Sequence, residues 1–118
     1  MATTPSGPKE QAARTAAAPE DLRRKWIFLN RIRQDDAFND WLNRTMLTDD
    51  NQLGIVVSSP LTAKELSSRV EQLLKRLAAP SPGETLILKA YAPGKPLRLL
   101  GTGTRHGENG AFSWTPAP

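Results

Sequence analysis

Cysteine is absent from this chain, and histidine occurs only once. The lack of cysteine excludes a disulfide, a thiolate metal site and a cysteine nucleophile. The single histidine, His106, lies between Arg105 and Gly107 in a glycine-rich stretch. A usual transition-metal site needs further His or Cys ligands. We therefore interpret His106 as an exposed turn residue and expect no cofactor.

Long apolar runs are also missing from the sequence. No stretch approaches the roughly 20 apolar residues that a membrane span requires. The N-terminal segment is rich in Ala, Thr and Pro and lacks the apolar run of a signal peptide. We therefore expect a cytoplasmic protein that does not bind membranes.

The remaining composition is that of one small domain. A chain of 118 residues fits a single hydrophobic core, and a net charge of +4 is only a weak indication of a polyanionic partner. Residues 1–19 contain no large apolar side chain after Met1, so ordering them would cost entropy without burial in return. The sequence predicts a disordered tail over residues 1–19 and one domain over residues 20–118.

Aromatic side chains are concentrated in residues 22–47, which contain Trp26, Phe28, Phe38 and Trp41. The apolar residues of the first half fall on one side of a helix, in an arc centred near Leu22, and those of the second half fall on the opposite side. A break at residues 34–36 allows both halves to face one core. We predict two helices, with Asp35 or Asp36 as N-cap of the second. The four aromatics can then all face one core, and the competing interpretation is that they anchor a binding partner.

The rest of the chain predicts one further helix and a small sheet. Residues 53–58 are typical of a strand buried on both faces. Thr62 and Glu65 form a capping box that begins a helix over residues 63–77. Turn residues then separate strands over residues 85–91 and 97–104, and residues 111–115 are a candidate last strand. The expected fold class is α+β: two helices followed by β-α-β-β(-β), in a small mixed sheet packed against helices.

Gly101 and Gly103 lie in the strand expected over residues 97–104. The stretch from Gly101 to Arg105 does not fit a P-loop, which needs GxxxxGK followed by Ser or Thr. It does not fit a dinucleotide fingerprint either, because no helix follows. We interpret the two glycines as a weakened strand end or a bulge.

Two surfaces are candidates for binding. On the first helix, Arg23, Arg24 and Arg31 project away from Leu22 and Leu29, with Ile27 among them. The competing interpretation of this stripe is a solvated helix face. Trp41 on the second helix is a further candidate anchor for a protein partner.

The hairpin offers the other surface. Lys89 and Tyr91 share one strand face, Arg98, Thr102 and Thr104 share one face of the next strand, and Arg105 follows. Phe112 and Trp114 are expected beside them. Basic and aromatic side chains together on a sheet can bind single-stranded nucleic acid. The competing interpretation is that the aromatics pack over a sheet end.

These features favour a non-enzymatic adaptor or regulatory protein that binds another protein. The candidate binding residues are Arg23, Arg24, Ile27, Arg31, Trp41, Lys89, Arg98 and Arg105. The alternative is an accessory protein that contacts nucleic-acid phosphates through a basic face, with affinity that falls steeply with salt. An enzyme whose site is assembled from distant residues is a third hypothesis. The sequence does not specify the oligomeric state or the identity of the partner.

Overall fold

Three helices and five strands form the part of the chain that the computed structural model describes, residues 19–58 and 60–118 apart from the side chains of Pro19 and Asp21. The tail was predicted over residues 1–19; residues 1–18 lie outside the described residues, and Pro19 is the first residue of α1. In chain order the elements are α1 (Pro19–Gln34), α2 (Ala37–Asp40), β1 (Leu42–Leu47), β2 (Leu53–Val57), α3 (Ala63–Ala78), β3 (Leu86–Ala92), β4 (Arg98–Arg105) and β5 (Phe112–Pro116). The α+β fold class is thereby confirmed.

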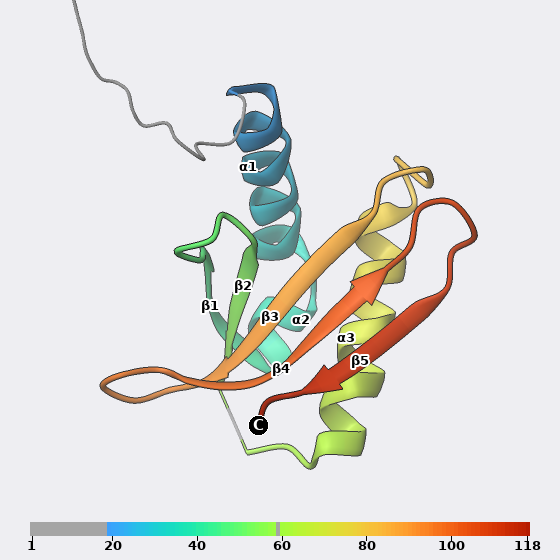
Figure 1. Cartoon of the computed structure of the whole chain (residues 1–118). Coiled ribbons are helices and arrows are strands. Elements are labelled where there is room, and N and C mark those ends of the chain that lie inside the picture. Colours follow the sequence, from blue (N-terminus) through green and yellow to red (C-terminus); the bar gives the residue numbers. More distant parts are fainter. Residues whose placement is uncertain (1–18, 59) are drawn as a thin grey trace, which may run out of the picture.

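The five strands form one mixed sheet in the order β1-β2-β3-β4-β5. β2 and β3 are parallel, and the other neighbouring strands are antiparallel. In Figure 1, β4 and β5 pass in front of α3, and α1 lies above the upper end of β2. α1 contacts β1 and β2, whereas α3 contacts β3, β4 and β5. One face of the sheet thus carries the helices, and the other face is open.

The crossover from β2 through α3 to β3 has the predicted boundaries almost to the residue. Thr62 Oγ1 accepts a hydrogen bond from the Glu65 backbone N–H at 3.1 Å, and Glu65 Oε1 accepts one from the Thr62 N–H at 3.0 Å. This capping box satisfies two donors that the start of a helix leaves free. Below it, the apolar stripe of α3 is at most 2% exposed: Leu66, Val70, Leu73, Leu74 and Leu77. Burial of five such side chains contributes on the order of 10 kcal/mol before entropy is subtracted.

β1 is the largest departure from the predicted fold, because residues 42–47 were expected to continue the second helix. α2 is a single turn, and β1 pairs with β2 with an irregular register between Leu42 and Arg44. A bulge of this kind inserts one residue and interrupts the alternation of apolar and polar side chains. As a result, Leu42, Met46 and Leu47 are spaced along the sequence like the apolar residues on one face of a helix, which explains the helix prediction for this segment.

The turn from β1 to β2 is held by Thr48. Its backbone N–H donates to the Gln52 carbonyl at 2.9 Å, and its hydroxyl accepts from the Gln52 N–H at 3.0 Å. Asn51 has a φ of 62°, a conformation that asparagine tolerates better than most residues. The predicted turn is present, but it joins two strands rather than a helix and a strand.

Gly101 and Gly103 of β4 provide room for aromatic rings on the helix side of the sheet. A Cβ at Gly101 would lie 2.2 Å from Cζ2 of Trp114, and one at Gly103 would lie 2.5 Å from Cγ1 of Val70. Both distances are far below van der Waals contact. Packing therefore requires glycine at both positions of β4. Trp114 and Phe112 of β5 lie over them.

Replacement of Gly101 by alanine tests this packing. We expect Gly101→Ala to lower the free energy of unfolding by about 1–3 kcal/mol, because the new methyl group must displace the Trp114 ring. Gly83→Ala is the matched control, since a Cβ at Gly83 meets nothing within 4 Å. Urea unfolding followed by tryptophan fluorescence measures both variants. Equal stability of the two variants would contradict the packing argument.

Candidate functional site

Among the described residues, the large apolar side chains that are exposed to solvent belong to two adjacent residues of α1. Trp26 is 48% exposed and Ile27 is 44% exposed. Both occupy the side of the helix that faces away from the sheet. We define the outer face of α1 as the following six exposed residues: Glu20, Arg23, Trp26, Ile27, Asn30 and Arg33.

The exposure of Trp26 corrects the interpretation in which all four aromatics of residues 22–47 face one core. The side of α1 that contacts the sheet is set by Phe28, Leu29 and Ile32, each at most 4% exposed. At about 100° per residue, Trp26 lies roughly 115° from the centre of that buried arc. Leu22, which the prediction placed at the centre, lies at the edge and is half-buried.

The predicted arginine stripe on α1 is divided among three environments. Arg23 is exposed on the outer face. Arg24 forms an ion pair with Glu84, with 3.5 Å between Nη1 and Oε1. Arg31 is half-buried, with its guanidinium carbon 5.0 Å from the Phe28 ring centroid and its Nη1 donating to the Leu77 carbonyl at 3.4 Å. Arg31 therefore joins α1 to the end of α3 and is not part of a solvated stripe.

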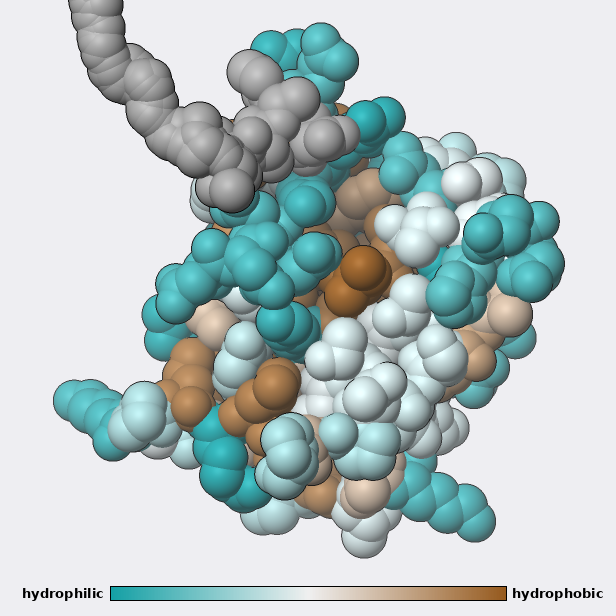
Figure 2. Space-filling view, in the orientation of Figure 1, coloured by the Kyte–Doolittle hydropathy of each residue, from teal (hydrophilic) through white to brown (hydrophobic). Residues whose placement is uncertain are grey.

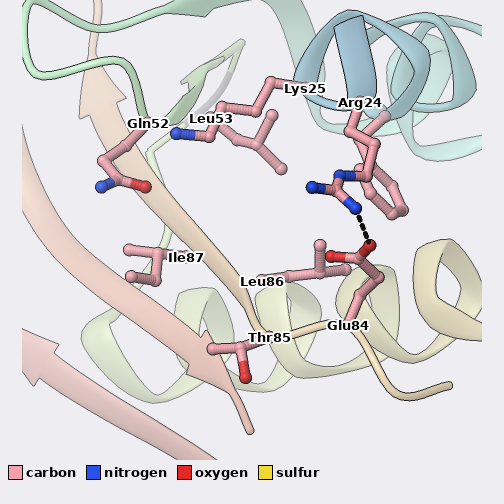
Figure 3. Close-up of a pocket in the computed structure, with 9 residues that line it drawn as sticks. Arg24, Lys25, Gln52, Leu53, Glu84, Thr85, Leu86 and Ile87 are labelled. Carbon is pink, nitrogen blue, oxygen red and sulfur yellow. Dashed lines mark ion pairs between the residues drawn. The ribbon is translucent and has the colours of Figure 1, made fainter. Parts of the chain in front are cut away.

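A cleft of about 300 Å³ lies on the inner flank of α1 and is drawn in Figure 3. Arg24 and Lys25 enter it from α1, and Glu84 and Leu86 enter it from the start of β3. Lys25 Nζ donates to the backbone carbonyl of Asn51. The two basic side chains of this cleft thus form contacts within the protein, and these contacts connect the first turns of α1 to the sheet.

Trp41, the predicted anchor of the second helix, is 5% exposed and belongs to the core. It is therefore not available as a surface anchor. Its edge closes a second cleft, about 390 Å³ in volume, between α2 and α3. Two ion pairs cross this cleft: Asp40 with Arg69 at 3.5 Å, and Asp35 with Arg76 at 2.8 Å.

The basic residues of the hairpin do not form one patch. Lys89 lies on the open face of the sheet, where its Nζ is 2.7 Å from Asp50 Oδ2. Arg98 pairs in register with Ala92 and lines a pocket near Leu61, on the side of the helices. Arg105 is seven residues further along β4, about 23 Å away, and donates to the Pro82 carbonyl at 3.1 Å. The expectation that Arg98 shares a face with Thr102 and Thr104 was wrong, because the register shifts next to Tyr91.

Phe112 and Trp114 also lie on the opposite side from Lys89 and Tyr91. Both rings pack against the hydrophobic core from β5, over the glycines of β4. The competing interpretation, in which these two aromatics pack over the sheet, is the correct one for them. The hairpin therefore does not present the interleaved basic and aromatic surface that was considered for nucleic acid.

The open face of the sheet is mixed in character. Its central strand contributes Ile87, Lys89 and Tyr91, all half-buried, and β4 contributes Thr102 and Thr104. Figure 2 shows this side of the molecule with isolated brown residues among pale and teal ones. Scattered apolar residues of this kind are usual on protein surfaces, whereas binding faces tend to be continuous.

The described residues contain no group of three or more His, Asp or Glu side chains that could hold a metal ion. His106 lies in the turn between β4 and β5, with Nε2 3.4 Å from Ser113 Oγ and Nδ1 3.8 Å from Glu108 Oε1. None of the described helices is both long and apolar enough to cross a membrane.

Known proteins give no guide to this surface. No protein-family model matches the chain, nor does any curated protein or any solved structure.

Asp35 links three elements at the cleft between α2 and α3. Its carboxylate accepts two hydrogen bonds from Arg76, at 2.8 and 2.9 Å, and one from the Ala37 backbone N–H at 3.0 Å. The hydrogen bonds from Arg76 are the main reason that the pKa of Asp35 lies below its ordinary value, and Asp35 in turn raises the pKa of Arg76. Asp36 occupies the N-cap position of α2 but makes no capping hydrogen bond, so Asp35 caps this helix.

The lowered pKa predicts a stability contribution that depends on pH. The stabilisation is present above the unfolded pKa of about 3.9 and is lost as pH falls through the lower folded pKa. Because the Arg76 side chain is 49% exposed, we expect Asp35→Asn to cost only about 1 kcal/mol at pH 7. The cost should decrease progressively as pH falls below the unfolded value.

Urea unfolding of Asp35→Asn at several pH values measures this contribution. Asp49→Asn is the control, because Asp49 is exposed in the β1–β2 turn and its side chain has no hydrogen bond or ion pair with the described residues. A cost for Asp35→Asn that is the same at pH 7 and pH 2 would show that the charge pair is not its source.

Proposed function

We propose that this protein is a non-enzymatic protein-interaction module, and that its contact surface is the outer face of α1. The observation that carries the proposal is the exposure of Trp26 and Ile27, at 48% and 44%. Tryptophan and arginine are the residue types that most often dominate the binding energy of protein interfaces. Here Trp26 and Ile27 lie at the middle of the helix, with Arg23 and Arg33 on either side.

The rigidity of α1 supports the same proposal. Its inner face is fixed in the core by Phe28, Leu29 and Ile32, and Arg31 ties it to α3. A partner would therefore not pay the entropic cost of ordering this helix when it binds. An exposed tryptophan on a rigid element is a ready anchor, and burying it removes apolar area from water at about 25 cal/mol per Å².

The open face of the sheet is the weaker candidate for the same role. Tyr91 is its aromatic residue, and its neighbours are largely hydroxyl-bearing or charged side chains. Lys89 is already paired with Asp50. Contacts to such a face would bury less apolar area and would compete with hydration of the hydroxyl groups.

Loss of the anchor tests the proposed function. We expect Trp26→Ala to reduce the retention of bound proteins on the immobilised full-length chain by about 30-fold, the effect of a 2 kcal/mol anchor. The melting temperature should stay within about 2 °C of the wild type, because an exposed side chain adds little to folding stability. Quantitative mass spectrometry of proteins eluted from the two columns measures the effect.

Tyr91→Ala is the matched control, since it removes an aromatic ring from the open sheet face. It should leave retention unchanged. If Tyr91→Ala abolished retention and Trp26→Ala did not, the contact surface would lie on the sheet and the proposal would be wrong.

A further inference from the structure

β5 is an edge strand of the sheet, and among the described residues no strand pairs with its outer side. In Figure 1 it is the outermost strand, and α3 passes behind it. Its register against β4 is fixed at its far end, where the Ala117 N–H donates to the Leu100 carbonyl at 3.1 Å. The backbone groups on its outer side follow from this register.

The other end of the β4–β5 pair gives the same alternation. The His106 N–H donates to the Ala111 carbonyl at 2.8 Å. Because bonded pairs recur at every second residue of an antiparallel ladder, the N–H and C=O of Ser113 also point toward β4. Phe112 and Trp114 consequently direct their N–H and C=O groups away from β4, along the free edge.

The two edges of the sheet differ in how they are protected against further pairing. β1, at the opposite edge, carries Arg44, has an irregular register and contacts α1 and α2. β5 has no charged residue, and its register with β4 is regular. Charges, bulges and covering elements are the usual means by which proteins prevent an edge strand from pairing with another chain. The edge of β5 is therefore the one that is open to an added strand.

We propose that β5 pairs antiparallel with β5 of a second copy of this chain, about a two-fold axis at Ser113, and so joins the two five-stranded sheets into one. In this register Phe112 lies opposite Trp114 of the partner subunit, and the two residues exchange N–H···O=C hydrogen bonds in both directions. Every outward N–H and C=O group of Phe112 and Trp114 is then satisfied. The inference goes beyond the proposed function, because it uses a different surface from the outer face of α1.

The side chains of β5 fit this pairing on both faces of the sheet. On the helix side, the rings of Phe112 and Trp114 pack against the core. Each Phe112 ring therefore meets a Trp114 ring of the partner subunit, and aromatic pairs across strands stabilise sheets. On the open side, Ser113 meets Ser113 of the partner subunit, so no like charges face each other at the axis.

The position of α3 leaves room for the second copy and favours β5 itself as the added strand. α3 packs mainly over β4, and three strand spacings, about 14 Å, separate β4 from β4 of the partner subunit. Helices in contact lie roughly 8–10 Å apart, so the two α3 helices do not collide. The strand that fits must place bulky apolar side chains in the gap between these helices, and β5 supplies Phe112 and Trp114.

The size of the contact sets the expected strength. A contact made by one short strand from each copy falls in the range of weak, reversible interfaces. We therefore expect a dimer that dissociates on dilution in the micromolar range. Sedimentation of the full chain should show an average mass that rises from 13.0 kDa toward twice that value with concentration. Because α1 contacts β1 and β2 at the other end of the sheet, the dimer presents two copies of the outer face of α1.

Disulfide cross-linking tests the register, because the chain has no cysteine of its own. At the axis the two Ser113 Cα atoms form a non-hydrogen-bonded pair about 4.5 Å apart, a separation that a disulfide can bridge. Thr115→Cys is the matched control, since Thr115 is exposed on the same face but its two copies lie about 14 Å apart. With oxidised glutathione at about 100 µM protein, Ser113→Cys should form linked dimers about tenfold faster than Thr115→Cys. Non-reducing electrophoresis measures both rates.

A pair of lysine variants gives a second measurement by sedimentation. Ser113→Lys places two like charges at the axis and should weaken the dimer about fivefold, because like charges directly opposite each other destabilise a strand pair. Thr115→Lys adds the same net charge but faces Ala111 of the partner subunit, and it should change the dimer less than about twofold.

The outcomes separate this inference from the proposed function. A wild-type chain that stays monomeric at about 1 mM, or equal cross-linking of the two cysteine variants, overturns the pairing of β5 with its copy. The proposed function is tested by the loss of captured proteins in Trp26→Ala, which does not depend on β5.

Discussion

The contact between α3 and one face of the sheet organises the rest of this molecule. The apolar stripe of α3 lies against β3, β4 and β5, and the parallel crossover from β2 to β3 fixes which face it covers. α1 must then cover β1 and β2 on the same side, with Phe28, Leu29 and Ile32 turned inward. With α1 in this orientation, Trp26 and Ile27 lie on the side of the helix that faces solvent. The exposed surface of α1 is therefore a consequence of how the core is shared between two helices.

The sequence correctly predicted those elements whose signals come from residues close together in the chain. The capping box at Thr62 and Glu65, the stripe of α3 and the strands that follow it were all evident in the sequence. β1 was not, because its bulge disrupts the alternation on which a strand prediction depends. The register of β4 was equally hidden, since a shift beside Tyr91 moves Arg98 to the other face of the sheet.

The candidate surface was only partly predictable, for a related reason. Helical spacing correctly placed Arg23 and Ile27 outside, but it placed Trp26 inside, since the buried arc was centred on Leu22 rather than near Ile32. Which residue of an amphipathic helix marks the centre of its buried face depends on the tertiary contacts of that helix. Arg31 shows the same dependence, because the Leu77 carbonyl that accepts its hydrogen bond belongs to α3 and reaches it only in the folded chain.

The central claim is that α1 packs one face into the core and leaves Trp26 exposed on the other face. The three tryptophan indole N–H resonances test it most directly when a water-soluble paramagnetic agent is added to the labelled protein. Trp26 lies on the outer face, whereas Trp41 is buried and Trp114 packs over β4. The account predicts that the Trp26 resonance broadens while the other two are largely unaffected. Broadening of Trp41 or Trp114 with an unchanged Trp26, or equal broadening of all three, would contradict it.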